Sequence, residues 1–324
     1  MANNVVSILD HKDLPTPKVE QWKYTNLSRA LGGGLLEVVP EKIPEKIIHI
    51  PRGKVCEHIE DIMWTAVDKS HQHLHLKIVL EDSAEATVFE RHDGQGTYWK
   101  NMSTEIVLGA NARLNHVRLQ TDSMDAVQTN IVHITMERDS YLNSFSLNLG
   151  GKLTRHDIHA VLKGSNIDCS LNGVSLLNGN QHGDTTILME HTAPHCVSNQ
   201  FYRTILDDAS RGVFQGKVHV HQAAQKTDGY QLANTILLSP KAEMDTKPEL
   251  EIYADDVKCS HGTTTGALDE EPLFYLRSRG LSEGEARMLL MQAFVDEVVD
   301  KVADETMHAQ IKGMTEKWLK QQVS

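Results

Sequence analysis

Short apolar runs recur along the middle of the chain at a nearly constant spacing, and this repeat restricts the possible folds more than any other feature. Each run ends in Leu or Met and is followed by a turn rich in polar and small residues. The runs end at Leu80, Leu108, Met136, Leu162, Leu206 and Leu238, so the first three intervals are 28, 28 and 26 residues. A repeat of about 20–50 residues made only of strands and turns is typical of a solenoid or a propeller. We favour a β-helix, because the units are short and lack a Trp-Asp signature, although a jelly roll or a sandwich stays open.

Residues 71–266 alternate between apolar and polar side chains with a period of two, which is typical of strands. The clearest stretches are His71–Leu80, Glu105–Leu108, Leu114–Leu119, Ile131–Met136, Ser144–Leu149, Val218–His221 and Leu250–Tyr253. We therefore assign residues 71–266 to a mainly β core. Residues 1–70 form a mixed N-terminal region, interrupted by prolines, with one short helix expected around Glu20–Leu31 before three glycines.

The period changes in residues 267–324, which we assign to a C-terminal helical domain. A first helix is expected to end at Gly280, with arginines in its last turn. Ser282 and Glu285 have the spacing of a capping box, which predicts the start of a second helix. The apolar residues of that second helix are Leu289, Leu290, Phe294, Val298 and Val302. A third helix places Met307, Ile311, Met314 and Trp318 on one face.

The composition argues against several classes of function. Lys and Arg number 32 and Asp and Glu 44, which gives a net charge of −12 without a basic block. We therefore expect no nucleic-acid partner, because neutralising phosphates needs clustered basic residues. No apolar run is long enough to span a membrane, and the first residues lack the features of a secretory signal. The four cysteines are far apart, which predicts reduced thiols and a cytoplasmic protein.

Several groups of His and Cys side chains are candidate metal sites. His191, His195 and Cys196 form the densest group, but their spacing matches no common zinc motif and Pro194 makes helical ligation unfavourable. His219 and His221 share a strand face, as do His71, His73 and His75, and strand-face histidines of this kind often bind no metal.

Cys259 and His261 are the most specific pair, since they are expected on one face of the last strand, where the sheet meets the helices. Phosphate-binding loops, dinucleotide fingerprints, nucleophile elbows and zinc-protease motifs are all missing from the sequence. We therefore expect a protein that is not an enzyme.

The C-terminal half contains four stretches that together resemble one known family. They comprise residues 206–231, residues 237–242, the segment Pro-Glu-Leu-Glu-Ile-Tyr-Ala-Asp-Asp-Val-Lys-Cys-Ser-His-Gly at 248–262, and Leu-Phe-Tyr-Leu-Arg-Ser-Arg-Gly at 273–280. They resemble the SufB/SufD family of iron–sulfur cluster assembly proteins, and residues 15–27 look like the entry segment of its SufD branch. Cys259-Ser-His261-Gly is the SufD form of that segment, and Met244 stands where SufB-like chains carry a cysteine.

The resemblance implies a right-handed parallel β-helix flanked by helices. It also implies a complex in which this chain pairs with a SufB-like paralogue through the β-helix and docks a SufC-like ATPase through its C-terminal helices. The residues expected at the ATPase are Leu273, Phe274, Tyr275, Leu276, Arg277, Arg279 and Gly280. His261, with Cys259, is expected to hold iron or a nascent cluster transiently at the SufB interface, while the isolated chain binds no cofactor firmly.

Three possibilities stay open at this stage, of which two are alternatives to this function and one is a state of the isolated chain. The chain could be a SufB-type scaffold that holds a cluster on its own, which the missing thiol at Met244 disfavours. It could form a homodimer when isolated. It could also be a β-helical enzyme that acts on polysaccharide, although such enzymes are commonly secreted.

Overall fold

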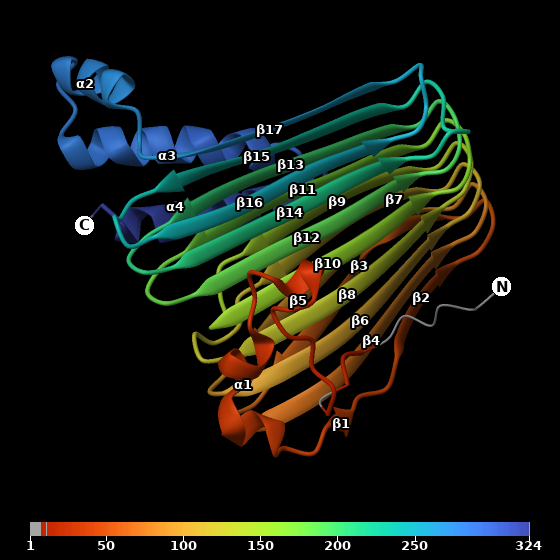
Figure 1. Ribbon diagram of the computed structural model, residues 1–324, viewed down its shortest axis with the longest axis horizontal. Coiled ribbons are helices and arrows are strands. Elements are labelled where there is room, and N and C mark those ends of the chain that lie inside the picture. Colours follow the sequence, from red (N-terminus) through yellow and green to blue (C-terminus); the bar gives the residue numbers. More distant parts are fainter. Residues whose placement is uncertain (1–7, 11, 324) are drawn as a thin grey trace.

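The computed structural model, which describes residues 8–10 and 12–323, is a parallel β-solenoid with helices at both ends of the chain (Figure 1). One sheet contains β1 (Glu41–Lys42), β2 (Lys46–Ile50), β4 (Ser70–Leu80), β6 (Tyr98–Leu108), β8 (Val127–Met136), β10 (Leu153–Leu162), β12 (His182–His191), β14 (Arg211–Val220) and β16 (Glu243–Ile252). The facing sheet contains β3 (Val55–Ala66), β5 (Glu85–Gly94), β7 (Arg113–Gln120), β9 (Tyr141–Asn148), β11 (Asp168–Leu177), β13 (Val197–Leu206), β15 (Asp228–Leu237) and β17 (Lys258–Gly266). From β3 to β17 the chain alternates between the sheets, so each coil contributes one strand to each. The β-helix prediction is confirmed.

The sequence repeat is the register of the nine-stranded sheet. Leu80 pairs with Leu108, Leu108 with Met136, and Met136 with Leu162, and all four side chains are fully buried between the sheets. Stacking equivalent residues at each turn makes a continuous apolar column, and burying one such side chain stabilises the fold by about 1.5–3 kcal/mol. The column continues through His191 and Val220.

The last two repeat ends predicted from the sequence lie elsewhere. Leu206 ends β13 of the eight-stranded sheet, and Leu238 directly follows β15 of that same sheet. The Leu or Met pattern leaves the first sheet at this point because a histidine, His191, occupies the equivalent position there. The next Leu that ends an apolar run, Leu206, belongs to the other sheet.

A second column of equivalent residues forms the turns of successive coils. Each has a positive φ, and its backbone N–H donates to a carbonyl of the following coil. The residues are Ser83, Asn111, Asp139, Asn166, His195 and Lys226. Asn, Asp and His tolerate this left-handed conformation better than most residues, and these types occupy four of the six positions.

The N-terminal region differs from the prediction in two respects. Strands β1 to β3 lie within residues 1–70, so the sheets begin earlier than the boundary at residue 71, and prolines between them obscure the alternation. The expected helix at Glu20–Leu31 is wrong in its bounds. A single 3₁₀ turn, η1 (Glu20–Trp22), precedes α1 (Leu27–Leu36), which begins where the Asn26 side chain accepts from the Arg29 backbone N–H.

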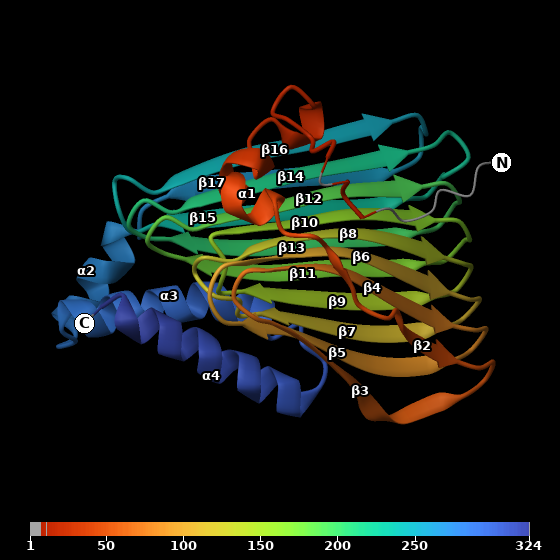
Figure 2. The same ribbon diagram turned by 90° about the horizontal axis from the view of Figure 1, so that it is seen from below.

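Segments from the two ends of the chain cover opposite outer faces of the solenoid (Figure 2). Residues 20–30 lie on the nine-stranded sheet, where the Arg155 guanidinium stacks on the Trp22 ring and Lys152 donates to the Ala30 carbonyl. The eight-stranded sheet is covered by α3 (Glu283–Val299) and α4 (Glu305–Gln321), and α2 (Glu270–Ser278) precedes them. Among the described residues, no helix combines the length and apolarity that crossing a membrane requires.

The C-terminal helices largely follow their sequence signals. Ser282 and Glu285 form the expected capping box of α3, and Met307, Ile311 and Trp318 of α4 are buried. The interpretation of Leu289 as part of the buried stripe is wrong, because 49% of its surface is exposed.

Candidate functional site

The open end of the solenoid is formed by two strands, β16 and β17, each of which is the last in its sheet. Cys259 pairs with Gly229 and His261 with Gln231, both of them buried residues of β15. Side chains alternate along a strand, so Cys259 and His261 both belong to the face turned towards the solenoid interior. Cys259 is partly buried against the core, whereas His261 is exposed because no further coil covers it.

A buried column of amides leads to His261. The Gln231 side chain donates to the Gln200 amide oxygen at 2.8 Å, and both residues are fully buried. His261 occupies the next position of this column, where its imidazole meets solvent. Within the described chain no hydrogen bond or ion pair holds the His261 ring, which leaves its nitrogens available to an external ligand.

Burial raises the pKa of the Cys259 thiol, a backbone hydrogen bond with Gly229 opposes this shift, and the Asp228 carboxylate reinforces it. At neutral pH the thiol is therefore largely protonated. A soft metal ion would have to displace that proton in order to bind the sulfur.

The predicted ATPase-docking residues lie on and directly after α2, which stands apart from the solenoid in both views (Figures 1 and 2). Leu273 is buried and anchors the helix, while Phe274 and Tyr275 are 74% and 56% exposed. The Arg279 guanidinium lies 5.2 Å from the centre of the Tyr275 ring. Gly280 follows with a φ of +99°, the left-handed conformation that glycine adopts after a helix. Leu276 is partly buried, and Arg277 is exposed.

His191, His195 and Cys196 do not form a group of ligand atoms close enough to share a metal among the described residues. His191 is buried at the end of β12, with Nε2 2.8 Å from the Ser198 hydroxyl. His195 is exposed in the left-handed turn column, and the Cys196 thiol donates to the Gly164 carbonyl at 3.1 Å. Each of the three residues thus has a packing or turn role.

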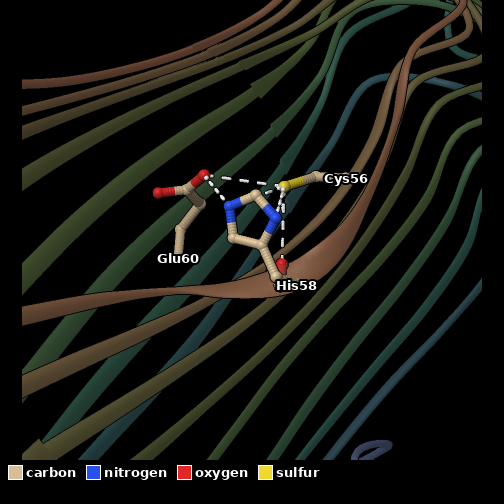
Figure 3. Close-up of side chains that lie close together, drawn as sticks. All are labelled: Cys56, His58 and Glu60. Carbon is tan, nitrogen blue, oxygen red and sulfur yellow. Dashed lines mark hydrogen bonds and ion pairs between the residues drawn. The ribbon is translucent and has the colours of Figure 1, made fainter.

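Sequence reasoning did not select a second Cys-x-His segment at the opposite edge of the eight-stranded sheet. Cys56, His58 and Glu60 lie on β3, where Figure 3 shows their side chains pointing toward one another. His58 Nε2 lies 3.0 Å from Glu60 Oε1, and Cys56 Sγ lies 3.5 Å from the same oxygen. The Cys-x-His spacing that this segment shares with Cys259 and His261 could have indicated it. The strand is hard to recognise in the sequence, because β3 pairs irregularly between Val55 and Ile59 and its alternation is disturbed there.

A third group combines Glu190 of β12 with His219 of β14 and with His221, which directly follows that strand. The sequence suggested the two histidines as a strand-face pair. It did not suggest Glu190, which is brought beside them by the register in which Glu190 pairs with His219.

Residues 63–294 match the family model described as "SUF system FeS cluster assembly, SufBD core domain". The match begins within β3, covers the rest of the solenoid and ends within α3. This chain belongs to the SufBD family. The predicted resemblance is therefore confirmed, and the Cys259–His261 edge lies inside the matched region.

Relatives with established names agree with this assignment. The iron–sulfur cluster assembly protein SufD of Escherichia coli is 33% identical over 316 residues, which cover 94% of this chain and 72% of that protein. A SufBD family protein of Synechocystis is 39% identical over 239 residues, and the chloroplastic protein ABCI7 of Arabidopsis thaliana is 33% identical over 241 residues. The matched segments span about half the length of these two relatives, 52% and 50%. Among SufBD proteins the chain is therefore SufD-like.

Proposed function

We propose that this chain is a non-catalytic scaffold subunit of a Suf iron–sulfur cluster assembly complex, in which its open solenoid end pairs with a SufB-like paralogue. The observation that carries the proposal is that β16 and β17 both end their sheets at the same end of the solenoid. Edge strands expose a row of backbone N–H and C=O groups that a partner strand can pair with. Tyr253, 58% exposed directly after β16, adds apolar surface to this end.

His261 and Cys259 would then lie at the interface between the two subunits. One imidazole and one thiol cannot complete a cluster site, so the remaining sulfur ligands would come from the paralogue. Iron or a nascent cluster is in this view transient cargo, and the isolated chain holds no cofactor firmly. The four cysteines are unpaired, which suits a function in the reducing cytoplasm.

The exposed face of α2 would dock a SufC-like ATPase. Phe274 and Tyr275 offer aromatic surface, and Arg277 and Arg279 offer positive charge beside it. Aromatic and arginine side chains are enriched at protein interfaces, where they contribute most of the binding energy. The fixed attachment of α2 through Leu273 would transmit movement of the ATPase to the end of the solenoid.

Co-expression with a SufB-like and a SufC-like protein tests the proposal. We expect one stable heteromer, loss of the SufC-like subunit with Phe274→Ser/Tyr275→Ser, and loss of cluster maturation in cells with His261→Ala. His58→Ala is the matched control, because it removes the other Cys-x-His imidazole. Failure to co-purify with either partner would disprove the function, and normal maturation with His261→Ala would disprove the site. Without the paralogue, the same edge strands of two copies would pair into a homodimer.

A stable chromophore on the isolated chain after anaerobic addition of iron and sulfide would instead favour a SufB-type scaffold.

A further inference from the structure

Glu190, His219 and His221 form a compact group of nitrogen and oxygen ligands on the outer face of the nine-stranded sheet. β12 and β14 lie side by side there (Figure 1), and Glu190 pairs directly with His219. The neighbouring residues Met189 and Val218 are fully buried between the sheets, so alternation turns Glu190 and His219 outwards. One ligand atom from each of the three residues lies within 4.8 Å of the others.

The three side chains already contact one another. Glu190 Oε2 lies 3.1 Å from His221 Nε2 and 3.9 Å from His219 Nδ1. The two imidazole rings are stacked with their centres 4.3 Å apart. A metal ion binds such atoms at about 2.0–2.2 Å, so small changes of side-chain torsion would let it replace the Glu190–His221 contact.

A fourth residue fixes the direction of the carboxylate. His159 of β10 lies with Nε2 2.5 Å from Glu190 Oε1, the oxygen that does not face His219 and His221. Metal-binding carboxylates are typically held by an outer partner of this kind, which orients the free oxygen towards the ion. His133 lies beside His159, with ring centres 5.5 Å apart.

The site is half-enclosed. The side chains of Glu190, His219 and His221 are 21%, 24% and 41% exposed. A cavity of about 540 Å³ lies on the same face, lined by His133, His159 and His219 together with Gln21 and Trp22 of the N-terminal segment. This cavity would leave coordination positions open to water or to a small ligand.

Two imidazoles and one carboxylate are ligands that Fe²⁺ and Zn²⁺ accept, and the same set with open positions is found in non-haem iron sites. Hard ions such as Mg²⁺ and Ca²⁺ prefer oxygen ligands alone. The absence of sulfur from the three ligands separates this site from both Cys-x-His edges. We propose that Glu190, His219 and His221 bind a divalent first-row transition-metal ion, Fe²⁺ or Zn²⁺, with His159 as the residue that positions the carboxylate. This site goes beyond the proposed function and does not depend on it.

Titration of the whole purified chain with Co²⁺ under reducing, anaerobic conditions tests the site. Co²⁺ bound by nitrogen and oxygen shows visible d–d bands, whereas a bound thiolate adds an intense near-ultraviolet charge-transfer band. We expect one equivalent to bind with d–d bands and no thiolate band. The variant His219→Gln/His221→Gln should bind at least about tenfold more weakly, and Fe²⁺ and Zn²⁺ should displace Co²⁺ from the wild type.

Cys56→Ser/His58→Gln is the matched control and should leave the Co²⁺ spectrum unchanged. His159→Leu should weaken binding about tenfold, whereas His159→Gln should restore it, because its amide can still donate to Glu190. A thermal midpoint within error of the wild type establishes that each variant is folded. The proposal is overturned if the wild type binds no Co²⁺, if His219→Gln/His221→Gln binds as tightly as the wild type, or if the spectrum is that of a thiolate that disappears with Cys56→Ser.

Discussion

The two edges of the eight-stranded sheet carry the same Cys-x-His spacing, but the histidine is hydrogen-bonded at one edge and has no hydrogen-bonding partner in the described chain at the other. At the first edge, His58 and Cys56 are engaged by Glu60 on their own strand. At the last edge, Cys259 is partly buried, and the exposed His261 has no hydrogen-bonding partner within the described chain. Soft ligands that are satisfied within the strand offer little to a partner, whereas an unengaged imidazole on an open edge does.

The interiors beneath the two edges differ in the same way. Near the first edge, the fully buried Lys100 ammonium donates to the Trp64 carbonyl at 2.7 Å, the Asp93 carbonyl at 2.5 Å and the Asp122 carboxylate at 2.7 Å. Near the last edge, a neutral amide pair leads to the exposed imidazole. The early coils are therefore closed by internal polar bonds, while the final coil is left incomplete.

The largest expected effect is on the closed end. Lys100→Met leaves the Asp122 carboxylate buried without its cation, and we expect a loss of about 3–5 kcal/mol in the free energy of unfolding. Lys217→Met, which breaks the exposed pair with Glu251, should change the free energy of unfolding far less, because water and salt screen an exposed ion pair. Urea unfolding of both variants measures the difference, and equal losses would remove the distinction between the two ends.

A second effect depends on pH and concerns His191, which is buried in the apolar column. Burial lowers the pKa of His191 to about 4, from about 6.5 when unfolded. The unfolded chain therefore binds the proton first, so this part of the stability is complete above pH 6.5 and is lost as the pH falls towards 4.

At pH 5 the expected loss in the free energy of unfolding is about 2 kcal/mol. His191→Leu should abolish that loss and restore the apolar column, so its free energy of unfolding should fall less steeply than that of the wild type as the pH is lowered. Urea unfolding between pH 4 and 8 checks this, and a wild-type slope in His191→Leu would contradict it.

A third effect concerns the cysteines at the two edges. Burial raises the pKa of both the Cys56 and the Cys259 thiols, so both should alkylate slowly at pH 7 and faster as the pH rises. Adding a SufB-like paralogue should slow the alkylation of Cys259 by about tenfold, a change of about 1.4 kcal/mol, and leave Cys56 unaffected. Mass spectrometry of the modified peptides measures both rates. Slower alkylation of Cys56 alone would contradict the proposal, because it would place the interface at the β3 edge and not at the β17 edge.

The smallest effect distinguishes a turn histidine from a ligand. His195 has a φ of +63°, so His195→Val should cost about 1 kcal/mol, whereas His195→Asn keeps the turn and should cost almost nothing. Thermal unfolding gives the stability, and cluster maturation in cells should be normal for His195→Asn. A loss of maturation with unchanged stability would show that the His195 imidazole has a role like that of His261.

The sequence revealed the solenoid because equivalent residues of stacked coils recur at nearly the coil length. Leu80, Leu108 and Met136 are neighbours in space at the same spacing at which they recur in the chain. The repeat was lost at His191, where a buried polar residue occupies an apolar position. The first strands were missed because prolines and the irregular pairing of β3 disturb the alternation.

The candidate site was predictable only where its residues are close in sequence. Cys259 and His261 are two positions apart on one strand, so a local pattern places them on one face. Glu190 and His219 are far apart in the sequence and are brought together by the pairing of β12 with β14, so no local sequence pattern predicts their contact. The same is true of the difference between Cys56 and Cys259, because only the order of strands in the sheet makes β3 and β17 its two edges.

By itself, therefore, the sequence determined the strand periodicity, the coil length, the helix caps and the family, since each depends on residues near one another or on a regular repeat. The tertiary structure decided which histidines are buried, which contact a carboxylate and which are exposed at an open edge. Those properties depend on the register and on the number of coils stacked above a residue, and for His261 that number is zero.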